Sequence, residues 1–504
     1  MAAVVSEVLL EQFSKFVAER IGLHFPKERW RDLERGIRSA AKELGFQETE
    51  SFLQHVLSSP LPRNQLEILA SNLTVGETYF YRDKKAFEAL EEHILPELLH
   101  SLRGKERRLR IWSAGCCTGE EPYSLAILLS KVIADLKDWN ITILATDINP
   151  RFLKKASLAT YSEWSFRDAP QWLKEKYLTR VKDGHFEIVY PIKKMVTFSH
   201  LNLAEDVYPS LLNNTNAMDI IFCRNVLMYF TPEQTKKVIQ NLYNSLADGG
   251  WLIVSSIENS SVLYPQFTTV NFHGLTVYRK NLSSQPVYSV ADFGTRIDLK
   301  LDTLNLKLAP AEPEPVFTSH LEPLASLEAE VIKPAVVQPI AYEEALALYR
   351  EGLYTEVTER LLGVLSKNGA DSKATSLLAR AYANQGKLIE ALEWCEKAVV
   401  DDKLNPGLYY LQATILEEQG AMEAAVASLK RALYLYQDFV LVHFALGSLS
   451  MRQRKLKQAD KHFENAISLL KTYHEEAIIP ESEGITAGRL LEIIQSTRYV
   501  ERLI

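Results

Sequence analysis

This chain of 504 residues has few cysteines, no net positive charge and no long apolar runs. Its four cysteines (Cys116, Cys117, Cys223 and Cys395) are too few for a disulfide framework and show no CxxC spacing, which favours a reducing compartment. Nowhere do about 18 apolar residues follow one another, so the sequence predicts no membrane span. The first residues lack the basic start and apolar core of a signal peptide. We therefore expect a cytoplasmic protein without direct membrane insertion.

The balance of charge is acidic. Lysine and arginine number 57 against 64 aspartates and glutamates, a net charge of −7, so a nucleic-acid partner would require a local basic patch. Apolar residues make up 47% and charged residues 24%, as in ordinary folded proteins. The length suggests about three domains.

Two kinds of periodicity divide the first 280 residues. Residues 1–75 show apolar positions at helical spacing, and a helix is expected over 26–44. After residue 76, short runs that are apolar on both faces alternate with helical stretches, which is typical of a parallel sheet in an α/β domain. These runs lie at 109–114, 141–146, 218–223 and 251–256. The runs HFEIVYP and MVTFSH, at about 185–200, predict a small antiparallel insertion.

The second half of the chain is a proline-rich segment followed by repeats. Residues 281–340 contain seven prolines and one glycine, which indicates an extended linker. From 341 to 470, mostly small residues recur every 34 positions, which resembles the tetratricopeptide repeat. A plain helical bundle is the alternative, and residues 471–504 are expected to form a capping helix or tail. The recurring sets are Ala345, Ala379, Ala413 and Gly447; Gly352, Gly386, Gly420 and Arg454; Val357, Ala391, Ala425 and Ala459; and Val364, Ala398, Ala432 and Ala466.

Chemically suggestive residues follow the predicted strands. In WSAGCCTGEEPYS (112–124), Gly115 and Gly119 would let a ligand approach the backbone, while the two glutamates after them favour a cationic or zwitterionic ligand over a phosphate. Asp147 ends the next strand, where an acid commonly binds ribose hydroxyls; a helix cap is the alternative.

Two further motifs carry cations. Arg224 and Asn225 follow the strand at 218–223, at the usual ligand edge of an open sheet, with a salt bridge inside the fold as the alternative. In VGETYFYRD, Thr78 and Arg82 are four apart and would share one face of a helix, with the intervening aromatics packed on the sheet domain. An interdomain clamp explains the same motif equally well.

Together these motifs resemble one family. TVGETYFYRD, WSAGCCTGEEPYS, ATDIN, SHLNL and FCRNVLMYF, in this order and spacing, are similar to the chemotaxis-receptor methyltransferases, the CheR family, over roughly residues 1–280. The resemblance implies an N-terminal helical domain and a Rossmann-like domain that binds S-adenosylmethionine and carries a small antiparallel β insertion. It implies methyl transfer to glutamate side chains on chemoreceptor helices, forming glutamate 5-O-methyl esters.

The resemblance also implies a site. Asp147 would bind the ribose, Glu121 would face the methionine end, and Asn202 and Leu203 would lie beside the adenine. Arg82 and Tyr229 would act at the transferred methyl, with Arg224 nearby, and no metal is expected. Gly76 stands where many members have asparagine, so a side-chain contact is lost there. The implied cofactor residues are Thr78, Arg82, Glu121, Asp147, Asn202, Leu203, Arg224 and Asn225.

The implied partners are proteins. A glutamate carboxylate is already ionised at pH 7, so its methylation needs no general base. The basic stripe Arg31, Arg35, Arg38 and Lys42 would steer acidic receptor helices towards the enzyme, although a solvated helix face is the alternative. The repeats would recruit a protein partner. A non-catalytic scaffold and a methyltransferase for nucleic acid or a small molecule are the competing readings, and the acidic charge and the missing NPPY-like motif disfavour the second.

Overall fold

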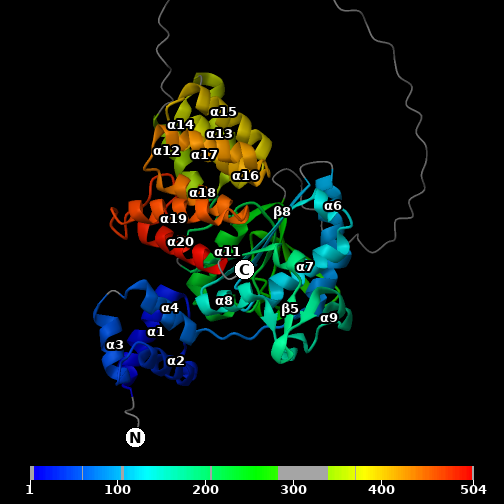
Figure 1. Cartoon of the computed structure of the whole chain (residues 1–504), viewed down its shortest axis with the longest axis vertical. Helices are drawn as coiled ribbons and strands as arrows, with labels where there is room; N and C mark the ends of the chain where they lie inside the picture. The colour runs from blue at the N-terminus through cyan, green and yellow to red at the C-terminus, as the bar shows by residue number, and fades with distance from the viewer. Residues whose placement is uncertain are drawn as a thin grey trace, which may run out of the picture.

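A computed structural model describes residues 5–59, 61–103, 107–204, 207–281, 339–368 and 371–501, so most of the predicted linker lies outside the described residues. Figure 1 shows a helical N-terminal domain, a central sheet domain and a helical repeat domain. None of the described helices is long and apolar enough to cross a membrane.

The N-terminal domain is a small helical bundle around one apolar core. Phe13, Val17, Leu33, Ile37 and Phe52 are completely buried in this core. The helix expected from residue 26 begins later, because a 3-10 turn at Lys27–Arg29 precedes it. The four helices are α1 (Glu7–Ile21), α2 (Trp30–Glu43), α3 (Thr49–Ser58) and α4 (Arg63–Leu73).

The central domain is a seven-stranded sheet in the order β6-β2-β1-β7-β8-β10-β9. The first five strands are parallel, and β10 is antiparallel to both β8 and β9. All four apolar runs predicted as strands are strands of this sheet. The strands are β1 (Arg108–Ala114), β2 (Asn140–Asp147), β6 (Val196–His200), β7 (Met218–Phe222), β8 (Leu246–Ile253), β9 (Phe267–Phe272) and β10 (Leu275–Lys280). The helices of this domain are α5 (Lys84–Ala89), α6 (Leu95–Arg103), α7 (Glu120–Val132), α8 (Pro150–Leu158), α9 (Gln171–Tyr177), α10 (Tyr190–Lys193) and α11 (Pro232–Ser245).

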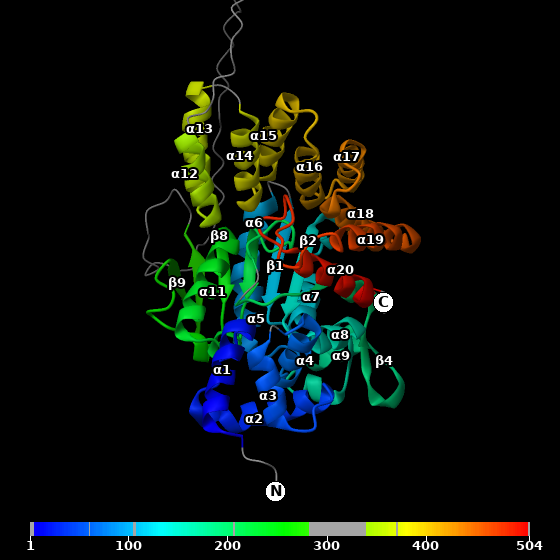
Figure 2. The ribbon, with the colours of Figure 1, turned by 90° about the vertical axis from the view of Figure 1, so that its left-hand side faces the viewer.

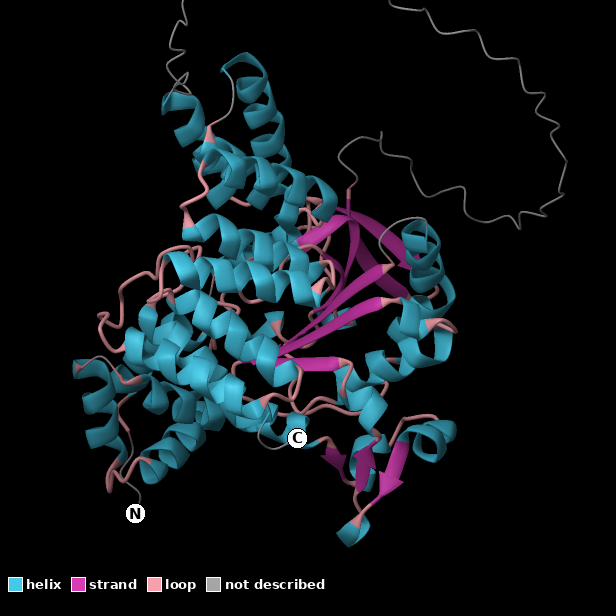
Figure 3. Ribbon diagram, turned by 45° about the horizontal axis from the view of Figure 1, so that its top comes forward, coloured by secondary structure: helices cyan, strands magenta, loops and turns pink. Residues whose placement is uncertain are grey.

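The predicted antiparallel insertion exists, but its expected bounds were partly wrong. The small sheet consists of β3 (Thr160–Tyr161), β4 (Leu178–Arg180) and β5 (Phe186–Ile188), and it lies apart from the main sheet in Figure 3. MVTFSH forms β6 of the main sheet, parallel to β2. The short helix α10 separates β5 from β6, and Val196 and Phe198 pack against the apolar core beneath α7 and α8.

The repeat domain is built from paired antiparallel helices. Ala345, Ala379 and Ala413 are buried at helix crossings, and an added Cβ at Gly447 would lie 2.6 Å from the Phe463 ring. Small residues thus allow the helices to approach closely, as in tetratricopeptide repeats. The helices are α12 (Pro339–Arg350), α13 (Tyr354–Asn368), α14 (Ser372–Asn384), α15 (Leu388–Asp401), α16 (Pro406–Glu418), α17 (Met422–Leu435), α18 (Val440–Arg452) and α19 (Leu456–Leu470).

The repeats dock on the amino edge of the sheet, as Figure 2 shows. Each of the four turns that recur every 34 residues has a left-handed residue at its tip and contacts the sheet domain. Along the chain, these turns contact the sheet domain in the same order in which the strands lie side by side. The contacts are near the amino ends of the strands, so the four turns lie at the edge opposite the carboxyl ends. The contacting pairs are Gly352 with Asn244, Gly386 with Arg108, Gly420 with Asn140, and Arg454 with Tyr190.

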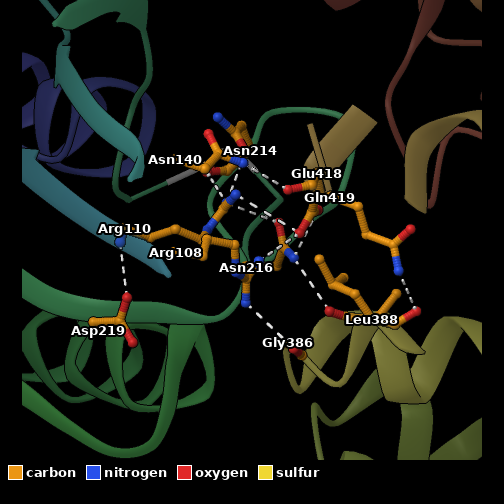
Figure 4. A network of polar contacts seen from close by, with 11 residues as sticks. Arg108, Arg110, Asn140, Asn214, Asn216, Asp219, Gly386, Leu388, Glu418 and Gln419 are labelled. Carbon is orange, nitrogen blue, oxygen red and sulfur yellow. Dashed lines mark hydrogen bonds and ion pairs between the residues drawn. The ribbon is translucent and has the colours of Figure 1, made fainter. Parts of the chain in front are cut away.

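The centre of this interface is the buried carboxylate of Glu418, drawn in Figure 4. It lies 3.1 Å from Arg108 and 3.7 Å from Arg110, and it accepts a 3.0 Å hydrogen bond from the Asn216 amide. Asn140 donates to the Glu418 backbone carbonyl at 3.0 Å. Strand ends and repeat turns are therefore joined by charged and amide groups.

The last described segment does more than cap the repeats. Helix α20 (Ala487–Glu501) packs on α19 and also contacts β6. Arg489 donates to the His200 backbone carbonyl at 2.8 Å. The described residues between β6 and β7 form no helix, and α20, from the far end of the chain, packs against β6 instead.

Candidate functional site

All nine residues predicted for the site line one cavity of about 260 Å³. It lies at the carboxyl ends of β1, β2 and β7, where ligands bind in open α/β sheets. The nine residues are Thr78, Arg82, Glu121, Asp147, Asn202, Leu203, Arg224, Asn225 and Tyr229.

The glycine turn after β1 forms one wall. Gly115 and Gly119 both have left-handed backbones, with φ of 80° and 94°. A Cβ added at Gly115 would lie 2.3 Å from a methyl carbon of Val226, so the turn packs directly on the loop that follows β7. The turn therefore requires glycine for both its backbone angle and its close packing.

Asp147 fixes the glycine turn through hydrogen bonds with backbone N–H groups. Its carboxylate accepts backbone hydrogen bonds from Cys117 and Asn149, both at 2.8 Å. The cap of α8 is supplied by Asn149 instead, so the helix-cap alternative for Asp147 is wrong. Burial raises the pKa of Asp147 to about 6. Each carboxylate oxygen has a second lone pair, which leaves acceptor capacity for ribose hydroxyls.

An ion pair crosses the cavity from α7 to the loop after β7. Arg224 lies 3.2 Å from Glu121 and 3.4 Å from Asp83, so the salt-bridge alternative for Arg224 is also real. Ser113 orients Glu121 through a 2.7 Å hydrogen bond. Arg224 Nε is buried and has no hydrogen-bond partner among the described residues. Such an orphaned donor in a cavity fits a site that accepts a polar ligand.

The strap between the helical domain and the sheet is not a helix. Residues 75–83 are extended and turned, so the expectation that Thr78 and Arg82 share a helical face was wrong, although both line the cavity. Phe80 and Tyr81 are buried in the sheet-domain core, as expected for the aromatics. At Gly76, an added Cβ would lie 2.5 Å from the Phe152 ring, so Phe152 occupies the space of a larger side chain.

The helical domain closes the other side of the cavity, which no sequence motif indicated. Ile21, Leu23 and Phe25 line it, and the His24 backbone N–H donates to the Tyr229 carbonyl at 2.6 Å. The Asn202 amide donates to the Arg20 carbonyl at 3.2 Å. These residues were missed because they come from an ordinary helix end, and only the tertiary fold brings them over the sheet.

An open α/β sheet with an antiparallel strand pair at one edge, a glycine turn after β1 and an acid at the end of β2 places this domain in the nucleoside-binding α/β class. Residues 76–273 match the family model described as "CheR methyltransferase, SAM binding domain", and 406–439 match a tetratricopeptide repeat. The cosubstrate is therefore S-adenosylmethionine, and the carboxylates and cations of the cavity suit its hydroxyls and charged end.

Relatives identify the family. The chain is 33% identical over 252 residues to the "Chemotaxis protein methyltransferase" of Borreliella burgdorferi, covering 49% of this chain and 87% of that protein. It is 26% identical to the "Probable biofilm formation methyltransferase WspC" of Pseudomonas aeruginosa, covering 77% of this chain and 90% of that protein. The chain belongs to the chemotaxis protein methyltransferase family. Among solved structures, MamA of Desulfovibrio magneticus RS-1 aligns with 26% of this chain and 75% of its own at 20% identity, with a TM-score of 0.25.

Proposed function

We propose that this enzyme methylates glutamate side chains of chemoreceptor-like signalling proteins and forms glutamate 5-O-methyl esters. The observation that carries this proposal is the chemistry of the cavity, in which Arg224 is paired with Glu121 and Asp83 while Arg82 has no carboxylate partner among the ion pairs of the described residues. The Arg82 cation favours an anionic acceptor such as a carboxylate.

A carboxylate acceptor requires no general base from the cavity. Glu121 is paired with Arg224, and Asp147 is occupied by backbone N–H groups. A glutamate acceptor has a reference pKa of about 4.3 and is ionised at pH 7, so it needs no base. Its oxygen forms a bond to the methyl carbon while the carbon–sulfur bond breaks, and S-adenosylhomocysteine leaves. The residues would contribute mainly by orienting the two reactants.

We assign roles along the cavity. Asp147 would accept from the ribose hydroxyls, Asn202 and Leu203 would contact the adenine, and Glu121 would face the charged methionine end. Arg82, held by a 2.7 Å hydrogen bond to the Glu77 carbonyl, would orient the acceptor carboxylate. The Tyr229 ring, which lies 5.6 Å from the Arg29 guanidinium, would shape the methyl site.

Receptor helices would approach along α2. Arg31, Arg35, Arg38 and Lys42 are exposed on this helix, and Arg35 pairs with Asp32. Exposed cations attract acidic helices over a Debye length of about 8 Å at physiological salt. The charge reversals R31E and R38E are therefore expected to slow receptor methylation most at low ionic strength.

The repeat domain would bind a second protein. Helices α16 and α18 face a cavity of about 1200 Å³ that β6 and α20 also line, with Tyr410, Thr414 and Phe444 on its repeat side. A cavity of this size between repeats and sheet has room for a peptide segment of a partner.

The test is incubation of the full chain with methyl-labelled S-adenosylmethionine and a receptor-containing membrane fraction. We expect base-labile label on receptor glutamates, and we expect R82A to lower kcat/KM at least 10-fold while cofactor affinity changes less. Label on another residue type would refute the proposal. Cofactor binding without any methyl transfer would favour the hypothesis that the protein is a non-catalytic scaffold.

A further inference from the structure

A second buried carboxylate lies behind the site and was not singled out by any motif. Glu258 ends the short helix η7 (Ser256–Glu258) after β8 and is 7% exposed. Its two oxygens accept hydrogen bonds from consecutive backbone N–H groups of the loop after β7 and from Ser255. The donors are Asn225 N (2.8 Å), Val226 N (2.7 Å), Leu227 N (2.8 Å), Met228 N (3.4 Å), Ser255 N (3.1 Å) and the Ser255 hydroxyl.

This arrangement is an anion nest whose anion belongs to the protein itself. Successive N–H groups converge when neighbouring residues alternate in backbone hand. Asn225 has a left-handed backbone with φ of 58°, which is uncommon for a residue other than glycine. A carboxylate that accepts several N–H bonds stabilises such a conformation, because each of these hydrogen bonds is charge-assisted. Glu258 therefore stabilises this conformation of the loop.

The backbone carbonyls of the same loop have a different role from its N–H groups. When N–H groups converge on one side of a loop, their carbonyls lie on the other side. Among the described residues, the carbonyls of Arg224 and Asn225 have no hydrogen-bond partner, and both residues line the cofactor cavity. Carbonyl oxygens carry partial negative charge and suit a cation.

We propose that Glu258 is a positioning residue for the cationic end of S-adenosylmethionine. It anchors the N–H side of the Arg224–Asn225 loop, and this leaves the two free carbonyls to meet the ammonium or sulfonium group. Glu121, on the facing helix α7 and paired with Arg224, adds a carboxylate from across the cavity. Glu258 itself touches neither cofactor nor acceptor.

The variant E258Q tests this role. Its amide nitrogen would face N–H donors, so part of the nest would be lost while the volume is retained. Calorimetry is carried out with three ligands: S-adenosylmethionine, S-adenosylhomocysteine and 5′-methylthioadenosine, which lacks the amino-acid portion and has no cationic end. We expect about 10-fold weaker binding of the first two ligands, equal to about 1.4 kcal/mol, and unchanged binding of the third.

Two further variants keep the test decisive. E258D preserves the charge but retracts the carboxylate by one methylene, so it should show the same selective loss even if E258Q folds poorly. E233Q alters an exposed glutamate in the first turn of α11 that takes no part in the nest, and it should bind all three ligands within about 2-fold of wild type. Equal losses for all three ligands, or no loss in E258D and E258Q, would overturn the proposal.

Discussion

Removal of the Glu418 carboxylate should loosen the repeat domain from the sheet. Glu418 is 7% exposed in its side chain, and the two arginines that face it, Arg108 and Arg110, are 12% and 2% exposed. In E418A both guanidinium groups lose this buried counter-charge, and the Asn216 amide loses a hydrogen bond. Breaking a buried ion pair from one side costs about 3–5 kcal/mol. Asp219 accepts from the Arg110 backbone and partly compensates its charge, so we expect the lower end of this range.

The assay is native-state hydrogen exchange of the amino edge of the sheet. A loss of about 3 kcal/mol in docking free energy corresponds to a roughly 100-fold larger open fraction. Amides at Asn140 and in the turns at Gly386 and Gly420 should therefore exchange roughly 100-fold faster if they exchange through undocking.

The neighbouring residue provides a matched control. Glu417 pairs with Arg452, which is 49% exposed, and exposed pairs contribute about 0–1 kcal/mol. E417A should therefore change exchange by less than about 5-fold. If E418A exchanged no faster than E417A at the sheet edge, the assignment of Glu418 as the centre of the interface would be refuted.

Three other outcomes follow from the site. Because burial raises the pKa of Asp147 to about 6, affinity for S-adenosylmethionine should fall roughly 10-fold by pH 5 as the ionised acceptor is lost; calorimetry across pH would contradict this if affinity stayed flat. G115A should lose at least 10-fold in cofactor affinity, because its Cβ meets Val226 and its φ is positive, whereas G363A, which has open space, should bind like wild type. Arg489 donates to the His200 backbone carbonyl, and His200 Nε2 lies 2.9 Å from the carbonyl of Ile148, the residue after Asp147, so R489A should weaken cofactor binding a few-fold. R498A is the control on the same helix: its partners lie in α19, and it should bind the cofactor normally.

Local sequence patterns were sufficient where the determining contacts are short in range. The runs that form β1, β2, β7 and β8 are apolar on both faces, and burial on both faces is possible only inside a layered sheet. The period of 34 identified the repeats because every repeat must solve the same packing problem with small residues at the same crossings. Asp147, Arg224 and Asn225 could be predicted from the residues themselves because they follow strand ends, and parallel strands bring their carboxyl ends to one edge. The resemblance to the family supplied the rest of the site.

The predictions that were wrong concern segments that could pair or pack with more than one part of the chain. HFEIVYP and MVTFSH are adjacent in sequence and equally strand-like, yet β5 pairs within the small sheet and β6 pairs with β2. Periodicity reports which residues prefer to be buried, but not which surface buries them. The spacing of Thr78 and Arg82 fits a helix, but the backbone N–H groups of the intervening Phe80 and Tyr81 bond to Ser165 and Ser124 of the sheet domain instead of to helical partners.

The amino-acid sequence by itself determined the fold class, the repeat architecture and the polar residues of the cofactor cavity, because these depend on periodicity, on positions next to strand ends and on motifs shared with the family. Only the tertiary structure decided that Glu258 holds the loop after β7, that the helical domain closes the cavity, and that Glu418 joins the repeats to the amino edge of the sheet. Each of these contacts joins residues between about 30 and 310 positions apart, and no local preference of the chain encodes such a distance.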